Sequence, residues 1–173
     1  MSDQQSIADG IEQCKPMLLR FLDGFDDASR TRQTPHQPNH VAWTLGHCAL
    51  TMHRAAGHFD DGSLPESAFI ADQFAGDSER FGVESVVRGS TPRPDPDLYP
   101  RLECCVSIYE SACDRLADVV RCAEARDLNA VVESNGDHPT ARDLLFALIF
   151  HNGTHCGQII DLRRALEMPN ILR

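Results

Sequence analysis

The chain has 173 residues, and its 16 basic and 26 acidic side chains give a formal net charge of −10. Only Lys15 is a lysine, and the arginines form no basic stripe, so we expect no binding to nucleic acid. No apolar run approaches the roughly 20 residues that span a bilayer, and residues 1–10 are too polar for a signal peptide, so we expect no membrane segment. The length fits a single domain over residues 1–173.

The seven cysteines are odd in number and include no Cys-x2-Cys pair. Most of them lie inside helical patterns, which argues against a disulfide framework or a structural zinc ribbon. We interpret them as free thiols that fill a core in a reducing compartment, and we therefore expect a cytoplasmic protein.

The first helical pattern covers residues 6–25, and its apolar stripe consists of Ile7, Ile11, Cys14, Leu18, Leu22 and Phe25. Pro16 lies inside this pattern and is expected to kink or split the helix. Residues 26–38 are polar and contain two prolines, so we expect a loop.

The second helix is expected over residues 39–59, with Asn39 as a good N-cap. Its apolar face consists of Val41, Leu45, Cys48, Ala49 and Met52, and Trp43 and His47 flank that face.

Histidines are frequent in and around the second helix. At 100° per residue His40 and His47 nearly coincide in direction, as do His47 and His58. Helix geometry alone therefore does not decide which of these three is a metal ligand. We expect His36 and His53 to face solvent.

Residues 60–96 form a long insertion rich in Gly, Ser, Pro and Asp. It has at most a short helical piece over residues 67–74, and the stretch 89–96, with three prolines, cannot be a regular helix. Loops of this length in a compact domain are commonly functional or partly disordered. We expect this one to drape over one end of the domain.

The third helix is expected over residues 97–125, with a three-four repeat of Leu102, Val106, Tyr109, Cys113, Leu116 and Val120. After a polar connection at residues 126–139, Thr140 is expected to cap the fourth helix, with Asp143 as its capping-box partner. No strand pattern competes with the helices. Four amphipathic helices with a long crossover loop between the second and third predict an all-α four-helix bundle.

The fourth helix, over residues 143–167, places His151 and His155 four residues apart on one face. Their Cβ atoms are then roughly 6 Å apart, so two ring nitrogens can reach one divalent ion at about 2.1 Å each. Gln158 lies on the same face and could orient a ligand or a bound water. Residues 152–154 are poor helix formers, and such a break in a well-patterned helix is where a functional site is expected. The alternative is a pair of interior histidines with ordinary hydrogen-bond partners.

Three segments resemble the DinB/YfiT-like superfamily. NHVAWTLGH at residues 39–47 is similar to its second-helix signature, and HNGTHCGQI at residues 151–159 is similar to its C-terminal signature. RGST at residues 88–91, followed by Tyr99 and Pro100, resembles a subset of these proteins. The resemblance covers nearly the whole chain in the correct order.

The resemblance implies a bundle in which His47, His151 and His155 bind one divalent metal ion, which in the family is zinc, nickel, iron or manganese. His40 then becomes a helix-entry residue rather than a ligand. The family also implies a homodimer. Its better-understood members transfer or isomerise with low-molecular-weight thiols such as bacillithiol, mycothiol or glutathione.

Three neutral imidazoles leave a bound ion with its positive charge and an open position, which lowers the pKa of a water or stabilises a thiolate. We therefore hypothesise a metal-dependent S-transferase or related isomerase that activates a thiol, or water, for attack on a small electrophile. Gln158 would hold a histidine or the ligand at the open position; an ordinary interhelical hydrogen bond is the equal alternative. No catalytic acid or base is assigned. The other hypotheses are a non-catalytic metal-binding bundle of a stress response and a structural helical dimer with a vestigial site.

The same segments exclude some enzyme classes and leave several neighbours open. The fourth helix lacks the glutamate of His-Glu-x-x-His metalloproteases, and no nucleophile elbow or nucleotide-binding loop is present. Cys48 and Cys156 adjoin proposed ligands but point about 100° away, so we interpret them as packing residues. Trp43 and Tyr109 either line the metal pocket or fill the core. The arginines of the long loop, Arg88 and Arg93, either bind an acidic cosubstrate or are simply solvated.

Overall fold

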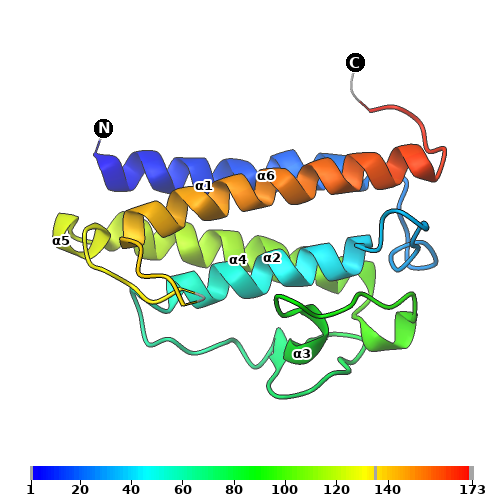
Figure 1. Ribbon diagram of the computed structural model, residues 1–173, viewed down its shortest axis with the longest axis horizontal. Coiled ribbons are helices and arrows are strands. Elements are labelled where there is room, and N and C mark those ends of the chain that lie inside the picture. The colour runs from blue at the N-terminus through cyan, green and yellow to red at the C-terminus, as the bar shows by residue number, and fades with distance from the viewer. Residues whose placement is uncertain (1, 135, 172–173) are drawn as a thin grey trace.

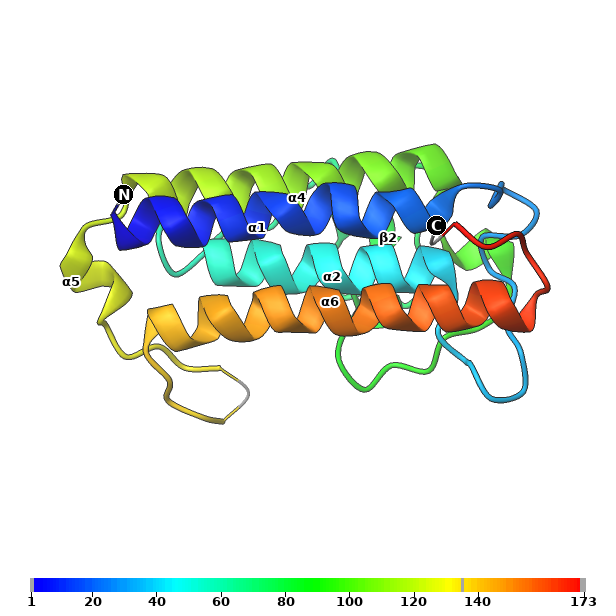
Figure 2. The ribbon, with the colours of Figure 1, turned by 90° about the horizontal axis from the view of Figure 1, so that it is seen from above.

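The computed structural model describes residues 2–134 and 136–171. Four long helices, α1 (Asp3–Leu19), α2 (Val41–Ala56), α4 (Leu102–Cys122) and α6 (Ala141–Ala165), lie along the long axis of the molecule (Figure 1). α1 packs against α4 and α6, and α2 packs against the same two helices, which places α1 and α2 diagonally (Figure 2). The expected all-α bundle is confirmed.

The directions of the helices explain the long crossover. α1 and α6 run one way along the bundle, whereas α2 and α4 run the other way (Figure 1). Because the consecutive long helices α2 and α4 are parallel, the chain must return along the bundle between them. This return contains four short elements: β1 (Phe69–Ile70), β2 (Phe81–Gly82), α3 (Val83–Val86) and η2 (Pro96–Leu98).

The crossover packs along the side of α2, not over one end of the bundle as expected (Figure 1). The expected helical piece at residues 67–74 is also wrong, because Phe69 and Ile70 pair in parallel with Phe81 and Gly82. Phe69 and Phe81 are both buried, with ring centroids 6.1 Å apart. Burial of these rings against α2 therefore outweighs the local preference for a helix.

α1 begins at Asp3 rather than at residue 6, because the Oγ of Ser2 accepts a hydrogen bond from the backbone N–H of Gln5. Pro16 lies within α1 without splitting it, since the helix continues to Leu19. The chain then tightens into the 3₁₀ turn η1 (Arg20–Leu22).

The N-cap of α2 is His40, and the prediction of Asn39 is wrong. The Nδ1 of His40 accepts a hydrogen bond of 3.1 Å from the backbone N–H of Trp43. His40 is therefore the helix-entry residue that the family resemblance implied. The amide of Asn39 is free to contact α6 instead.

The remaining helix boundaries follow local signals. α4 starts at Leu102 and not at residue 97, because Pro100 disfavours helical backbone before it. α4 ends at Cys122, and the polar connection contains one further short helix, α5 (Ala125–Leu128). The capping box of α6 is confirmed, with reciprocal hydrogen bonds between Thr140 and Asp143.

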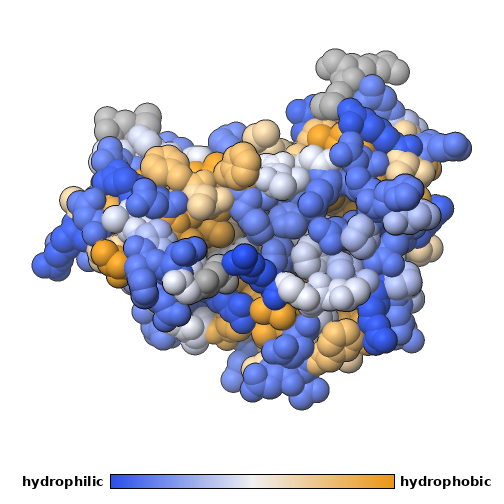
Figure 3. Space-filling view, in the orientation of Figure 1, coloured by the Kyte–Doolittle hydropathy of each residue, from blue (hydrophilic) through white to orange (hydrophobic). Residues whose placement is uncertain are grey.

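Apolar side chains gather on the outer face above α6 (Figure 3). Two phenylalanines of α6, Phe146 and Phe150, are 54% and 77% exposed. Within residues 2–134 and 136–171, no helix is both long and apolar enough to cross a bilayer.

Candidate metal centre

Three histidines converge where α2 and α6 pack against each other. Nε2 of His151 lies 3.2 Å from Nε2 of His47 and 3.1 Å from Nε2 of His155. The candidate ligand atoms of the three residues all lie within 4.8 Å of one another. His47 and His155 are buried, and His151 is half-buried. The helix pair thus places three imidazoles, far apart in sequence, around one point.

The hydrogen bonds of two of these histidines determine their tautomers. Nδ1 of His47 lies 2.8 Å from the backbone oxygen of Val86, and Nδ1 of His155 lies 2.9 Å from Oε1 of Gln158. Because carbonyl oxygens only accept, each Nδ1 carries the hydrogen and donates it. The Nε2 atoms of His47 and His155 therefore present lone pairs to Nε2 of His151.

This donor set fits a divalent metal ion. Three tetrahedral ligands about 2.1 Å from an ion are separated by about 3.4 Å, close to the two observed nitrogen separations. Without an ion, a single hydrogen on Nε2 of His151 faces two lone pairs, and its buried Nδ1 has no partner in the described part of the chain. A bound ion would accept the lone pairs of all three Nε2 atoms.

The surroundings keep the three imidazoles neutral. Burial, with a smaller contribution from the neighbouring histidines, lowers the pKa of His151 and of His155 to about 4 each. Burial is also the main cause that lowers the pKa of His47, while Arg54 and Arg88 add electrostatic repulsion. Neutral imidazole is the form that binds metal, so the cluster needs no deprotonation at neutral pH.

Gln158 connects the cluster to the start of α2. Its Oε1 accepts hydrogen bonds from Nδ1 of His155 and from Nδ2 of Asn39, both of 2.9 Å. The two interpretations of Gln158 are therefore compatible, since one hydrogen bond orients His155 and the other joins α6 to the start of α2.

Trp43 and the crossover hold His47 from the other side. The indole of Trp43 stacks on the ring of His47, with centroids 4.6 Å apart and planes 10° apart. Its Nε1 donates a hydrogen bond of 2.9 Å to Oγ of Ser90. Trp43 therefore both fills the core and forms a wall of the cluster.

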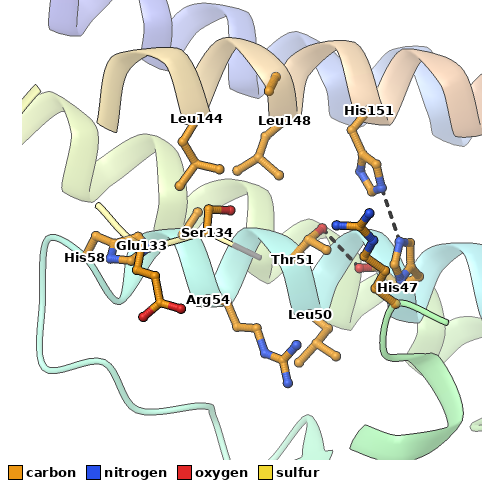
Figure 4. A pocket seen from close by; sticks show the side chains of 13 residues that line it. His47, Leu50, Thr51, Arg54, His58, Glu133, Ser134, Leu144, Leu148 and His151 are labelled. Atoms are coloured by element: carbon orange, nitrogen blue, oxygen red, sulfur yellow. Dashed lines mark hydrogen bonds between the residues drawn. The ribbon is translucent and has the colours of Figure 1, made fainter. Parts of the chain in front are cut away.

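A cavity of about 610 Å³ opens beside the cluster, and we call it the groove (Figure 4). It runs from His47 and His151 along α2 and α6 toward His58 and Glu133. Leu144 and Leu148 line its α6 side, as Figure 4 shows. The remaining lining residues are Leu50, Thr51, Arg54, Ala55, Arg88, Ser134 and Ala147.

Several other candidates lie away from the cluster. Tyr109 fills the core, where its hydroxyl contacts Asn152 and the backbone oxygen of Cys14, and it does not line the groove. Cys48 and Cys156 are buried and absent from the cluster, which agrees with their interpretation as packing residues.

The two loop arginines lie in different surroundings. Arg88 lines the groove, whereas the guanidinium of Arg93 lies 5.4 Å from the centroid of the Phe74 ring.

The other histidines in and around α2 also lie in different surroundings. His36 is exposed, as expected, and His58 lies at the far end of the groove. The prediction that His53 faces solvent is wrong, because the crossover covers it and leaves it 1% exposed. Sequence patterns also missed the contributions of Val86 and Ser90. Val86 acts through its backbone oxygen, which no residue type identifies.

The profile of the DinB superfamily matches residues 11–159. A crystal structure of a conserved protein from Enterococcus faecalis has the same fold, with a TM-score of 0.72 and 15% sequence identity over 95% of this chain and 96% of that one. No protein with curated annotation matches. The family match spans most of the chain, which therefore belongs to the DinB superfamily.

Proposed function

We propose that this protein is a metal-dependent transferase that joins a low-molecular-weight thiol to a small electrophile, with His47, His151 and His155 as the metal ligands. The observation that carries the proposal is the convergence of three Nε2 atoms beside an open groove. Zinc, nickel, iron and manganese are all compatible with nitrogen ligands, so the metal is one divalent ion of this group.

A divalent ion held by three neutral imidazoles supplies positive charge and an open position, at which a thiol or water loses its proton more readily. The protein's own residues prepare this site. Val86 and Gln158 fix the tautomers of His47 and His155, and the buried surroundings keep the rings neutral. These contacts support a site that is ready to bind before the cosubstrates arrive.

The net reaction balances without an oxidant or reductant. The sulfur–hydrogen bond of the thiol and the carbon–leaving-group bond of the electrophile break, and a sulfur–carbon bond forms. The leaving group takes the bonding electron pair and the proton departs with it. The groove beside His151 offers room for the electrophile next to the histidines.

Elemental mass spectrometry of the untagged protein tests the proposal, with His155→Ala as the variant and His36→Ala as its matched control. His36 is exposed and lies outside the cluster. We expect about one ion per chain in the wild type and in His36→Ala, and none in His155→Ala. Thiol-dependent consumption of an electrophile should follow the metal content.

Two outcomes would reject the proposal. A wild type that stays metal-free after reconstitution with each candidate ion leaves a structural bundle with a vestigial site. A protein that binds one ion but shows no thiol dependence with any electrophile is a non-catalytic metal-binding bundle. The homodimer, the cytoplasmic location and the absence of nucleic-acid binding stay predictions from the sequence.

A further inference from the structure

The groove contains two arginines that have no partner among the described residues. Among the arginines that the structure describes, most make ion pairs, hydrogen bonds to carbonyl oxygens or contacts with aromatic rings. No such contact of the guanidinium is found, within residues 2–134 and 136–171, for Arg32, Arg54 and Arg88. Two of these three line the same groove, in a chain whose net charge is −10.

Arg88 lies near the histidines, because the backbone oxygen of Val86, two residues earlier, is 2.8 Å from Nδ1 of His47. Arg54 follows His47 by seven residues on α2, which is about 10 Å along the helix axis. Helical side chains lean toward the helix N-terminus, so the guanidinium of Arg54 can reach back toward the cluster. An anionic group bound there would lie within one small molecule's length of the metal ligands.

The other charged lining residue is at the opposite end. Glu133 comes from the connection before α6 and lies near His58, away from the histidine cluster (Figure 4). Between the two ends, Leu144 and Leu148 give the groove an apolar side. The positive charge of the groove therefore lies between Glu133 and the histidine cluster, and it favours an anionic group on that side of Glu133.

We propose that Arg54 and Arg88 bind a carboxylate of a cosubstrate whose reacting atom sits at the three histidines. This inference rests on the proposed function and narrows its substrates to carboxylate-bearing molecules. Guanidinium groups bind carboxylates through paired, charge-assisted hydrogen bonds, which gives orientation as well as affinity. The carboxylate belongs to the thiol or to the electrophile, and the experiment separates these two sources.

Calorimetric titration with matched probes tests the proposal. Glutathione and its diethyl ester carry the same thiol, but only glutathione has free carboxylates; both are titrated into zinc-loaded protein. Glutarate, which has no thiol, is titrated into metal-free protein. The variants are Arg54→Gln/Arg88→Gln and, as the matched control, Arg32→Gln, which removes an exposed arginine outside the groove.

We expect the wild type and Arg32→Gln to bind glutathione at least about tenfold more tightly than the diester, and the double variant to bind both alike. Binding of the diester and of zinc should not change in the double variant. If only glutarate binding depends on the arginines, the electrophile carries the carboxylate. If the double variant binds glutathione as tightly as the wild type does, and also binds glutarate as tightly, the proposal is wrong. The glutarate arm needs no metal, so its outcome is independent of the metal content that tests the proposed function.

Discussion

The side-chain amide of Asn39 donates a hydrogen bond of 2.9 Å to Oε1 of Gln158, 119 positions later in the chain. The same oxygen accepts the Nδ1 hydrogen of His155. The residue before the cap of α2 therefore helps to orient a candidate metal ligand on α6. Partners of this kind set both the tautomer and the direction of a metal-binding histidine.

Replacement of Gln158 by Ala should weaken metal binding about ten- to hundredfold, because the ring of His155 loses its acceptor. Asn39→Ala should have a smaller effect, since Gln158 remains in place. Competition with a chelator of known zinc affinity measures both changes. Gln13→Ala removes an exposed glutamine of α1 and serves as the control. Unchanged zinc affinity in Gln158→Ala would contradict the role assigned to this contact.

Gly46→Ala should lower the free energy of unfolding by about 1–3 kcal/mol. A Cβ at this position would lie 2.6 Å from Cε1 of Phe81, whose ring is fully buried between the crossover and α2. Gly153→Ala is the matched substitution on α6, where a Cβ meets no atom within 4 Å. It should raise the free energy of unfolding by up to about 1 kcal/mol, because alanine is the better helix former.

Urea unfolding of the two alanine variants checks both signs. If Gly46→Ala leaves the free energy of unfolding unchanged, Phe81 packs less tightly against α2 than the structure shows. Loss of stability in Gly153→Ala would point to a second molecule on the outer face of α6, where the exposed Phe146 and Phe150 also lie.

Local patterns were sufficient to find the four long helices and two of the three candidate metal ligands. The spacing of His151 and His155 within one helix fixes their separation, and the Thr140–Asp143 pair marks the start of that helix. Neither feature depends on how the rest of the chain packs. The third histidine was different, because choosing His47 over His40 and His58 required either a partner helix or the family resemblance.

Tertiary contacts account for the burial of His53 and the role of Val86, which the sequence did not predict. His53 is buried because Phe69 and Arg115 pack against it, and neither contact leaves a periodic signal in α2. The same holds for the backbone oxygen of Val86, whose position depends on the path of the crossover. Both features depend on the path of the irregular crossover, which local sequence patterns do not predict.

Arg30→Lys should lower the free energy of unfolding by about 2–3 kcal/mol. Arg30 is 8% exposed and donates hydrogen bonds to the backbone oxygens of Pro96, Tyr99 and Pro100 ahead of α4. A lysine ammonium cannot reach these carbonyl groups with the same planar set of donors, so some would remain unpaired. Arg32→Lys alters an exposed arginine two positions away and should change stability by less than about 0.5 kcal/mol. Equal stability of the two variants in thermal unfolding would refute this assignment.

His53 should make the protein less stable as the pH falls. Burial, together with the charge of Arg115 that Asp60 partly opposes, lowers its pKa from 6.5 to about 4. Nη1 of Arg115 donates to Nδ1 of His53, and Nε2 of the histidine has no partner among the described residues. Protonation inside the fold is therefore costly, whereas the unfolded chain takes up the proton freely.

Between about pH 6.5 and pH 4 the unfolded state then binds more protons than the folded state at this residue. The free energy of unfolding should fall with decreasing pH in this window, and His53 contributes up to about 1.4 kcal/mol per pH unit. In His53→Gln this contribution is absent. The free energy of unfolding of this variant should therefore change less steeply with pH, by the slope that corresponds to nearly one proton. Urea unfolding at a series of pH values, with chelator present so that no metal contributes, measures the difference. At pH 7.5 the two proteins should differ only by a constant offset, and parallel curves down to pH 4 would show that His53 is protonated as easily in the fold as outside it.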